Sequence, residues 1–364
     1  MKKEKVISFV LVAVLMMSLL TACGSASSTP APTEPAQPAA ENTPKDNPTE
    51  EVVPEKVFSL SWAPAYDEEH GLTQAGLWAD EKIRELSGGK IAFEFFPGGQ
   101  LGNEREVFES IQLGTIDAAF MSSPVISGFS DVLNGFDMPY LCDNDMELYQ
   151  EIVNSGIGAQ MFEKLEEETG VVGISYLINP GRDFYFNCEF ESLDDAPGIK
   201  LRSMESPIHL ATYKALGFNP TPMAYSEIYQ AMKNGTIDGF EDVSVSVRAT
   251  KNYEVATTCA VSGHLTAAPV FIMSQKAWNS LTEEEQGWML EAGIAAQEAT
   301  KVTYMEQIPL TIEFMKEQGL NVVYIDIDEA KEKVQPVIDQ FCAENENIKM
   351  VVDYFNDYRE THGK

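Results

Sequence analysis

Cations are scarce in this sequence, which has 25 Lys and Arg against 57 Asp and Glu and a formal net charge of −32. Such an acidic chain is repelled by nucleic acid phosphates and by anionic lipid surfaces. No basic patch along the sequence offsets this charge. Nucleic acid is therefore not an expected partner, and any anionic ligand must be held by a local cationic site.

Catalytic and cofactor-binding motifs are also missing. The chain has no His-Glu-x-x-His, no Gly-x-Ser-x-Gly and no phosphate-binding glycine loop with lysine. Gly156-x-Gly158 lacks both the third glycine and the preceding strand of a dinucleotide site. The four histidines are not at metal-ligand spacing. We therefore expect a protein that is not an enzyme, with neither a cofactor nor a metal.

Cysteine is rare as well, with five residues and no Cys-x-x-Cys pair to indicate zinc or thioredoxin-like chemistry. Cys23 lies near the N-terminus, whereas the other cysteines are widely spaced in the body of the chain. These four could form two disulfides or stay free, and the sequence does not decide between the two: Cys142, Cys188, Cys259 and Cys342.

The N-terminus has the form of an export signal, because several lysines precede an apolar run from Val6 to Leu20. At about 15 residues this run is shorter than the roughly 20 that a membrane-spanning helix needs, so we predict a signal peptide over residues 1–22. Small residues and Cys23 follow the run and resemble the bacterial lipobox. We expect Cys23 to be acylated and to become the mature N-terminus, although an ordinary cysteine beside a signal peptide is the alternative.

Residues 23–55 are rich in Pro, Ala, Thr, Ser and Glu, and their large apolar residues are only Val52 and Val53. Such a segment cannot bury a core, and its prolines favour extended conformations. We expect a disordered, lipid-anchored linker that holds a folded body outside the cytoplasmic membrane.

The rest of the chain is too long for one compact core and predicts alternating strands and helices. Residues 58–62 and 91–95 alternate apolar and polar side chains as strands do. Residues 72–86 follow helical spacing, and a second helix is expected over residues 104–113, ending at Gly114. This order is typical of an α/β protein with a mostly parallel sheet.

An internal similarity suggests two lobes. Residues 110–120 resemble residues 231–240, and both segments end a helix at a glycine and enter a strand through Thr-Ile-Asp. Two lobes of similar build would explain this similarity. A common helix-to-strand turn used twice would explain it equally well.

A long helix is expected near the C-terminus. Thr282 and Glu285 form a capping-box pattern that starts a helical pattern of about 37 residues, longer than most globular helices. Pro309 lies inside this pattern and should kink the helix. One long helix could bridge two lobes, and two helices broken near Pro309 are the alternative.

Several motifs in order carry a specific resemblance. They are Pro97-Gly-Gly-Gln-Leu-Gly, Met138-Pro-Tyr-Leu, Gly181-Arg-Asp-Phe-Tyr-Phe-Asn, Gly198-Ile-Lys-Leu-Arg, Pro222-Met-Ala-Tyr-Ser-Glu and Asp238-Gly-Phe-Glu. Together they resemble the DctP-type solute-binding proteins of TRAP (tripartite ATP-independent periplasmic) transporters. The resemblance extends over nearly all of the chain from Lys56 to the C-terminus.

This resemblance implies a two-lobed, periplasmic-binding-protein-like α/β fold with a ligand cleft between the lobes and a long interdomain helix. We assign residues 56–179 and 268–307 to the first lobe, and residues 180–267 and 308–364 to the second. The resemblance also implies a monomer that captures a small organic acid and delivers it to the membrane subunits of a TRAP permease. A receptor that feeds a signalling partner, or an enzyme on a two-lobed binding fold, would be the alternatives.

The same resemblance implies a binding site. Arg202 ends a predicted strand and would form a two-point salt bridge with a carboxylate, which suits the paired donors of a planar guanidinium. Arg182 would be a second donor, and Tyr225 would form an aromatic wall. Asp242 stands where relatives commonly carry asparagine, and we expect it to favour acids that bear a hydroxyl or an amine, unless it faces solvent.

Other candidates come from the first lobe, and His264 is added from the second. Ser122 and Ser123 would face the cleft from the side opposite the arginines. Weaker candidates, each of which could serve packing instead, are Trp62, His70 and His264. The sequence does not identify the organic acid or the coupling ion of the transporter.

Overall fold

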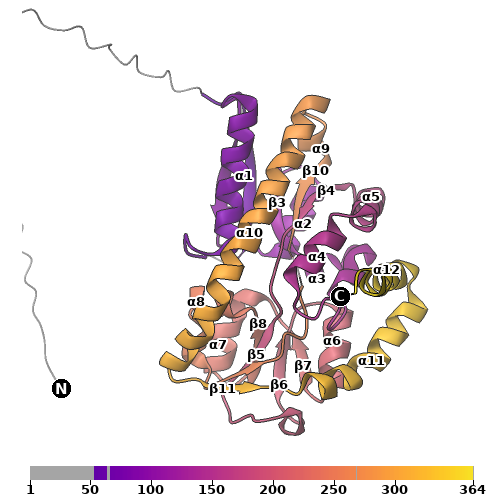
Figure 1. Cartoon of the computed structure of the whole chain (residues 1–364). Helices are drawn as coiled ribbons and strands as arrows, with labels where there is room; N and C mark the ends of the chain where they lie inside the picture. Colours follow the sequence, from indigo (N-terminus) through magenta and orange to yellow (C-terminus); the bar gives the residue numbers. More distant parts are fainter. Residues whose placement is uncertain (1–52, 64–65, 268, 364) are drawn as a thin grey trace, which may run out of the picture. The chain divides into compact units, whose positions relative to one another are not determined.

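The computed structural model of the protein describes residues 53–63, 66–267 and 269–363. The predicted signal peptide, the predicted lipidation site Cys23 and nearly all of the predicted linker lie outside these residues. Two β-sheets with helices packed on them organise the described body (Figure 1). Within the described part of the chain, no helix is both long enough and apolar enough to span a bilayer.

The strands of the first sheet are β1 (Lys56–Trp62), β2 (Ile91–Pro97), β3 (Ala118–Ser122), β4 (Val171–Tyr176) and β10 (Pro269–Ser274). They lie in the order β2-β1-β3-β10-β4. β1 pairs in parallel with β2 and β3, and β10 lies antiparallel between β3 and β4. The apolar residues of the alternating pattern in β1 are buried, as expected: Phe58, Leu60 and Trp62.

The strands of the second sheet are β5 (Asp183–Phe186), β6 (Lys200–Ser203), β7 (Asn219–Pro222), β8 (Gly239–Asp242), β9 (Thr258–Val261) and β11 (Asn321–Tyr324). They lie in the order β11-β9-β5-β8-β6-β7. β5 is antiparallel to both of its neighbours, whereas β6 is parallel to β7 and β8. The chain passes from the first sheet to the second after β4, returns between β9 and β10, and passes to the second sheet again between β10 and β11.

Helices connect these strands. Those before β5 are α1 (Gly71–Ser87), α2 (Glu104–Gln112), α3 (Ser123–Ile126), the 3-10 helix η1 (Val132–Asp137), α4 (Met146–Val153) and α5 (Gly156–Thr169). Those after β5 are α6 (Pro207–Ala215), α7 (Ile228–Lys233), α8 (Ser244–Ala249), α9 (Gln275–Trp278), α10 (Glu283–Glu317), α11 (Ile327–Glu344) and α12 (Glu346–His362). Short 3-10 helices are also formed by η2 (Leu193–Asp195), η3 (Tyr225–Glu227) and η4 (Asn252–Val255).

The long helix α10 is continuous over 35 residues and contains Pro309. Thr282 and Glu285 form the predicted capping box at its start. The alternative of two helices broken near Pro309 is therefore wrong. In Figure 1, α10 runs beside α1 and continues to α8, so it lies along both sheets.

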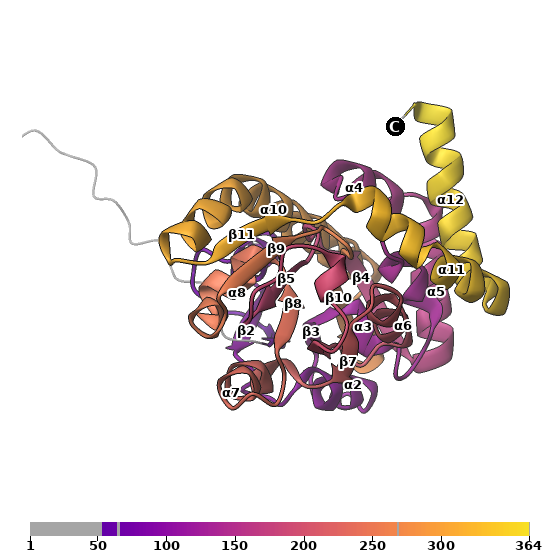
Figure 2. The same ribbon diagram turned by 90° about the horizontal axis from the view of Figure 1, so that it is seen from below.

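The C-terminal helix α12 packs on the core of the first sheet. Its buried Val351 and Phe355 share a cluster with Phe136 and Tyr149. Figure 2 shows how α11 carries the chain away from β11 toward this side of the molecule. The sequence assigned residues 308–364 to the second lobe, whereas α12 contacts the core of the first sheet. The lobe boundaries stay a prediction.

The cysteines of the described residues are all free. Cys142 and Cys259 are buried, whereas Cys188 and Cys342 are partly exposed. Of the two possibilities left open by the sequence, the structure therefore has the one without disulfides.

Candidate functional site

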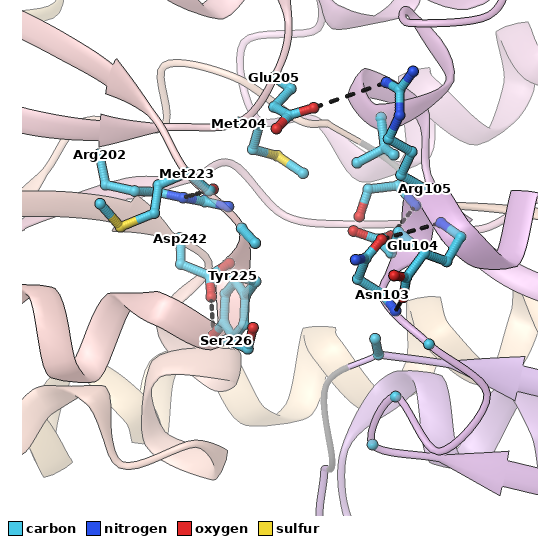
Figure 3. Close-up of a pocket in the computed structure, with 18 of the residues that line it drawn as sticks. Asn103, Glu104, Arg105, Arg202, Met204, Glu205, Met223, Tyr225, Ser226 and Asp242 are labelled. Atoms are coloured by element: carbon cyan, nitrogen blue, oxygen red, sulfur yellow. Dashed lines mark hydrogen bonds and ion pairs between the residues drawn. The ribbon is translucent and has the colours of Figure 1, made fainter.

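A cavity of about 500 Å³ lies between the two sheets (Figure 3). Ser122 ends β3, whereas Arg202 and Asp242 lie at the ends of β6 and β8. Arg182 directly precedes β5, which runs antiparallel to β8 and so begins at the same edge of the second sheet. Strand ends are where open α/β sheets gather ligands, so this topology brings distant residues to one cavity. The predicted candidates that line it are Arg182, Arg202, Tyr225, Asp242 and Ser122.

A smaller cavity of about 30 Å³ adjoins the first. The two cavities share part of their lining, including Tyr66, Arg182 and Asp242. His70 and Ser246 line only the smaller one. This volume holds about one water molecule and is too small for an organic acid.

The two arginines meet a carboxylate that the sequence did not single out. Arg182 Nε pairs with Glu241 Oε2, and Arg202 Nη1 lies 3.5 Å from Glu241 Oε1. All three side chains are buried, and Glu241 is fully so. Burial raises the pKa of Glu241, while the positive charges of Arg182 and Arg202 oppose this rise. Glu241 lies within Asp-Gly-Phe-Glu, so the motif contained this residue but did not reveal its partners.

Arg182 is occupied within the protein. Its Nη2 donates to the Glu241 carbonyl at 3.0 Å and lies 3.1 Å from Asp242 Oδ1. Burial alone would disfavour its charge, yet Glu241 and Asp242 together raise the pKa of Arg182. Its guanidinium is therefore held by two carboxylates before any ligand arrives.

Arg202 is less occupied. Its Nε donates to the Met223 carbonyl at 3.0 Å, and its Nη1 faces Glu241. Its Nη2 has no hydrogen-bond partner among the described residues, although Arg202 lines the cavity. This arginine can therefore still donate to an incoming carboxylate.

Asp242 faces the cavity rather than bulk solvent, with an exposed fraction of 3%. The hydroxyl of Tyr225 donates to Asp242 Oδ2 at 2.6 Å, and the Val243 amide donates to Oδ1 at 2.8 Å. The Arg202 guanidinium lies 5.7 Å from the centre of the Tyr225 ring. The predicted aromatic wall and the unusual aspartate are thus joined to each other.

The opposite wall belongs to the first sheet and its helices, as Figure 3 shows for Asn103, Glu104 and Arg105. The Ser122 amide donates to Glu104 Oε1 at 2.7 Å. Burial raises the pKa of Glu104, against this hydrogen bond and the positive charges of the two arginines. Arg105 Nη1 reaches across the cavity to Glu205 Oε2 at 4.0 Å. Sequence reasoning missed Glu104, although it directly follows Pro-Gly-Gly-Gln-Leu-Gly-Asn.

The other predicted candidates lie behind the cavity walls. Ser123 donates to Asp137 Oδ1 at 2.6 Å, and Trp62 packs between Phe95 and Phe120. The His264 ring stacks on the ring of Phe184 in β5, with 4.0 Å between the two ring centres. Neither described cavity is lined by Ser123, Trp62 or His264. A ligand role for them stays a prediction.

Asp137 leads to a prediction about pH. It is fully buried, its Oδ2 has no partner among the described residues, and burial raises its pKa to about 7 against the Ser123 bond and Arg182. A carboxyl whose folded pKa is raised stabilises the fold at low pH, and this stabilisation is lost as pH rises toward 7. We expect Asp137→Asn to lack this dependence, so that its stability deficit relative to the parent shrinks from pH 5 to pH 8 by on the order of 2 kcal/mol.

Urea melts of both proteins at the two pH values measure this difference, because all other titrating groups are common to both. Asp357→Asn removes an exposed carboxyl on α12 and serves as the control, with the same small effect at each pH. If the stability deficit of Asp137→Asn relative to the parent is equal at pH 5 and pH 8, then Asp137 does not have a raised pKa in the folded protein.

Comparisons with known sequences give a consistent result. Residues 66–345 match the family model described as bacterial extracellular solute-binding protein, family 7. The chain is 30% identical over 263 residues to YiiZ of Salmonella typhimurium, spanning 71% of this chain and 80% of that protein. It is 25% identical over 261 residues to the sialic acid-binding periplasmic protein SiaP of Vibrio cholerae, spanning 72% of this chain and 81% of SiaP.

Solved structures share the fold. A TRAP periplasmic solute-binding protein from Polaromonas sp. JS666, bound to D-erythronate, has a TM-score of 0.77 at 26% identity and covers 82% of this chain and 98% of its own. Another from Bradyrhizobium sp. BTAi1, in complex with α/β-D-galacturonate, has a TM-score of 0.77 at 25% identity and covers 82% and 99%. These similarities confirm the predicted two-lobed α/β fold.

Proposed function

The chain belongs to the bacterial extracellular solute-binding proteins of family 7, and we propose that it captures a small organic acid between its two sheets and delivers it to a TRAP membrane permease. The protein binds and releases its ligand without chemical change. The permease is the membrane partner, and the protein acts as a monomer outside the cytoplasmic membrane.

The position of Arg202 in the cavity wall is the observation that carries this proposal. It lines a cavity of about 500 Å³, a volume typical of small-molecule sites, and it keeps an amino group free for a ligand. An ionised carboxylate that accepts from a guanidinium in such a site gains a charge-assisted hydrogen bond. The ligand carboxylate therefore binds at Arg202, with Tyr225 beside it.

The ligand carries one carboxylate rather than two. Arg182 is already held by Glu241 and Asp242, so it is not free to neutralise a second acid group. The opposite wall presents the Glu104 carboxyl, which would repel a second carboxylate when ionised. Carboxylates on both walls instead suit a ligand that donates hydrogen bonds.

Hydroxyl groups supply such donors. The relatives with solved structures include proteins bound to D-erythronate and galacturonate, which combine one carboxylate with several hydroxyls. Hydroxyls of this kind could donate to Asp242 and Glu104 while the carboxylate accepts from Arg202. We propose a monocarboxylic hydroxy acid of sugar-acid type as the ligand class.

Thermal-shift measurements on the purified protein test this proposal. The panel contains D-galacturonate, D-erythronate and L-gulonate, with succinate as a dicarboxylate of similar size. A ligand at 100 times its dissociation constant stabilises the folded protein by about 2.7 kcal/mol, which gives a clear shift. Stabilisation by succinate alone would contradict the ligand class, and no stabilisation by any organic acid would contradict the function.

We also propose that Cys23 carries a lipid that anchors the protein outside the membrane. The basic, apolar and small-residue pattern before Cys23 supports this anchor. Intact mass measurement of protein extracted from membranes decides the matter. A mature chain that begins at another residue, or that carries no acyl mass, would contradict the anchor.

Asp242 gives a prediction about selectivity. Asp242→Asn replaces the carboxylate that accepts from Tyr225 with a neutral amide. Arg182 then loses one of its two carboxylate partners. We expect affinity for the best hydroxy acid of the panel to fall about tenfold, because an acceptor for its hydroxyl is weakened. Affinity for succinate should rise, because one source of repulsion is gone.

Calorimetry with the parent and the variant across mono- and dicarboxylates measures this change. Asp357→Asn, on the exposed face of α12, is the matched control and should keep the parental profile. If Asp242→Asn and the parent rank the acids identically, Asp242 plays no part in selection.

A further inference from the structure

His70 lines the small cavity that adjoins the main cavity. It is the N-cap residue of α1, beside the first sheet, and its exposed fraction is 1%. Its Nε2 lies 3.0 Å from the hydroxyl of Ser246, which belongs to α8 beside the second sheet. One imidazole thus connects helices of both halves of the molecule.

The hydrogen bonds of His70 define its tautomer. The Leu72 amide donates to Nδ1 at 3.1 Å, so Nδ1 carries no proton. The proton must then lie on Nε2, which donates to Ser246. Burial, with a contribution from the nearby Arg248, lowers the pKa of His70 to about 3, so the ring is neutral at physiological pH. Both bonds can therefore exist together.

His70 also supports a residue of the cavity wall. The Tyr66 ring stacks on the imidazole with 3.5 Å between ring centres and an interplanar angle of 7°. The ring of Tyr304 in α10 also packs on the imidazole, in an edge-to-face arrangement, and lies close to Gly71. Tyr66 lines the main cavity, whereas His70 lines only the cavity of about 30 Å³. A ligand in the main cavity therefore meets Tyr66 and not His70.

We propose that His70 is a positioning residue that joins α1 to α8 through Ser246 and holds the Tyr66 ring in place against the bound acid. This inference rests on the proposed function, since ligand affinity is one of its measures. It differs from the role expected from the sequence, in which His70 contacts the ligand directly. When the two halves are joined around a ligand, the bond to Ser246 resists their separation and slows dissociation.

The variant His70→Asn separates this role from helix capping. Asparagine is among the best N-cap residues, and its side-chain oxygen can accept from the Leu72 amide. It is too short to reach Ser246 and offers no ring for Tyr66 to stack on. The N-cap is therefore kept, and any loss of thermal stability without ligand comes from the lost ring contacts and the lost bond to Ser246. The dissociation constant should rise about fivefold through faster dissociation.

Ser246→Ala removes the other partner of the bond, together with the interaction of the Ser246 hydroxyl with Tyr66, and should raise the dissociation constant to a similar extent. The double variant should bind no more than about twofold worse than His70→Asn, because residues that act through one bond are not additive. His362→Asn, near the exposed C-terminal end of α12, is the control and should bind as the parent does. The probe is whichever of D-galacturonate, D-erythronate and L-gulonate binds the parent best.

Hydrogen exchange without ligand gives a second measure. In His70→Asn the amides of α8 should exchange faster, while those of α6 keep their parental rates. Unchanged affinity in both single variants, or effects that simply add in the double variant, would overturn the inference. If no probe binds the parent, the sugar-acid proposal fails, and unchanged exchange in α8 would then overturn the role of His70 separately.

Discussion

Arg202→Ala is expected to abolish high-affinity binding, with a loss of about 2–5 kcal/mol, because a buried ligand carboxylate would lose its charged partner. The structure strengthens the reason. Arg182 is held by Glu241 and Asp242, so it cannot replace Arg202. Arg202→Lys should also bind poorly, because an ammonium cannot reproduce the donors of a guanidinium toward Met223, Glu241 and a ligand at once.

Calorimetry with the best acid of the panel measures this loss. Arg84→Ala is a suitable control, since Arg84 forms a surface ion pair with Asp80 on α1 and lies outside both cavities. It should bind within about twofold of the parent. An Arg202→Ala protein that binds within about threefold of the parent would eliminate Arg202 as the carboxylate partner.

Much of the binding wall could be predicted because strand ends are visible in a sequence. Arg202 follows an apolar strand pattern, and Ser122 and Asp242 follow the two Thr-Ile-Asp segments that enter β3 and β8. β6 and β8 are parallel neighbours in one sheet and end at the same edge, which brings Arg202 and Asp242 together. Motif order added Arg182 and Tyr225, which lie beside β5 and in η3.

The pairing of these residues could not be predicted. Glu241 lies within a wholly buried strand. A buried carboxylate is costly unless it is paired, and the sequence does not show which residues pair with it. Its partners come from β6 and from the segment before β5, so only the three-dimensional structure shows Glu241 between two guanidiniums. Trp62 shows a related limit, because a strand-end aromatic can face either the cleft or the core, and the sequence does not say that it packs on Phe95 and Phe120.

Long-range packing limited the fold prediction in the same way. The helical pattern of α12 is local, but the surface that α12 covers depends on the path of α11. The state of the cysteines likewise depends on which residues approach one another in space. Disulfide geometry requires a short separation between the two Cα atoms, which spacing along the chain does not reveal.

Glu241→Ala is expected to have the largest effect on stability of any change at the site. Glu241 is fully buried and forms ion pairs with both Arg182 and Arg202. Removing it leaves two buried guanidiniums with less compensating charge, and breaking a buried ion pair in this way costs about 3–5 kcal/mol. Asp242 would still pair with Arg182, so Arg202 loses its only carboxylate partner among the described residues.

Urea unfolding of the ligand-free proteins measures this effect without involving ligand binding. Glu241→Gln keeps the shape and an acceptor while removing the charge, so its stability should lie between those of the parent and the alanine variant. Glu313→Ala breaks an exposed ion pair with Lys316 on α10 and should cost no more than about 1 kcal/mol. If Glu241→Ala unfolds at the same urea concentration as Glu313→Ala, then Glu241 does not neutralise the arginines, and its ion pair with Arg182 does not keep that residue from the ligand.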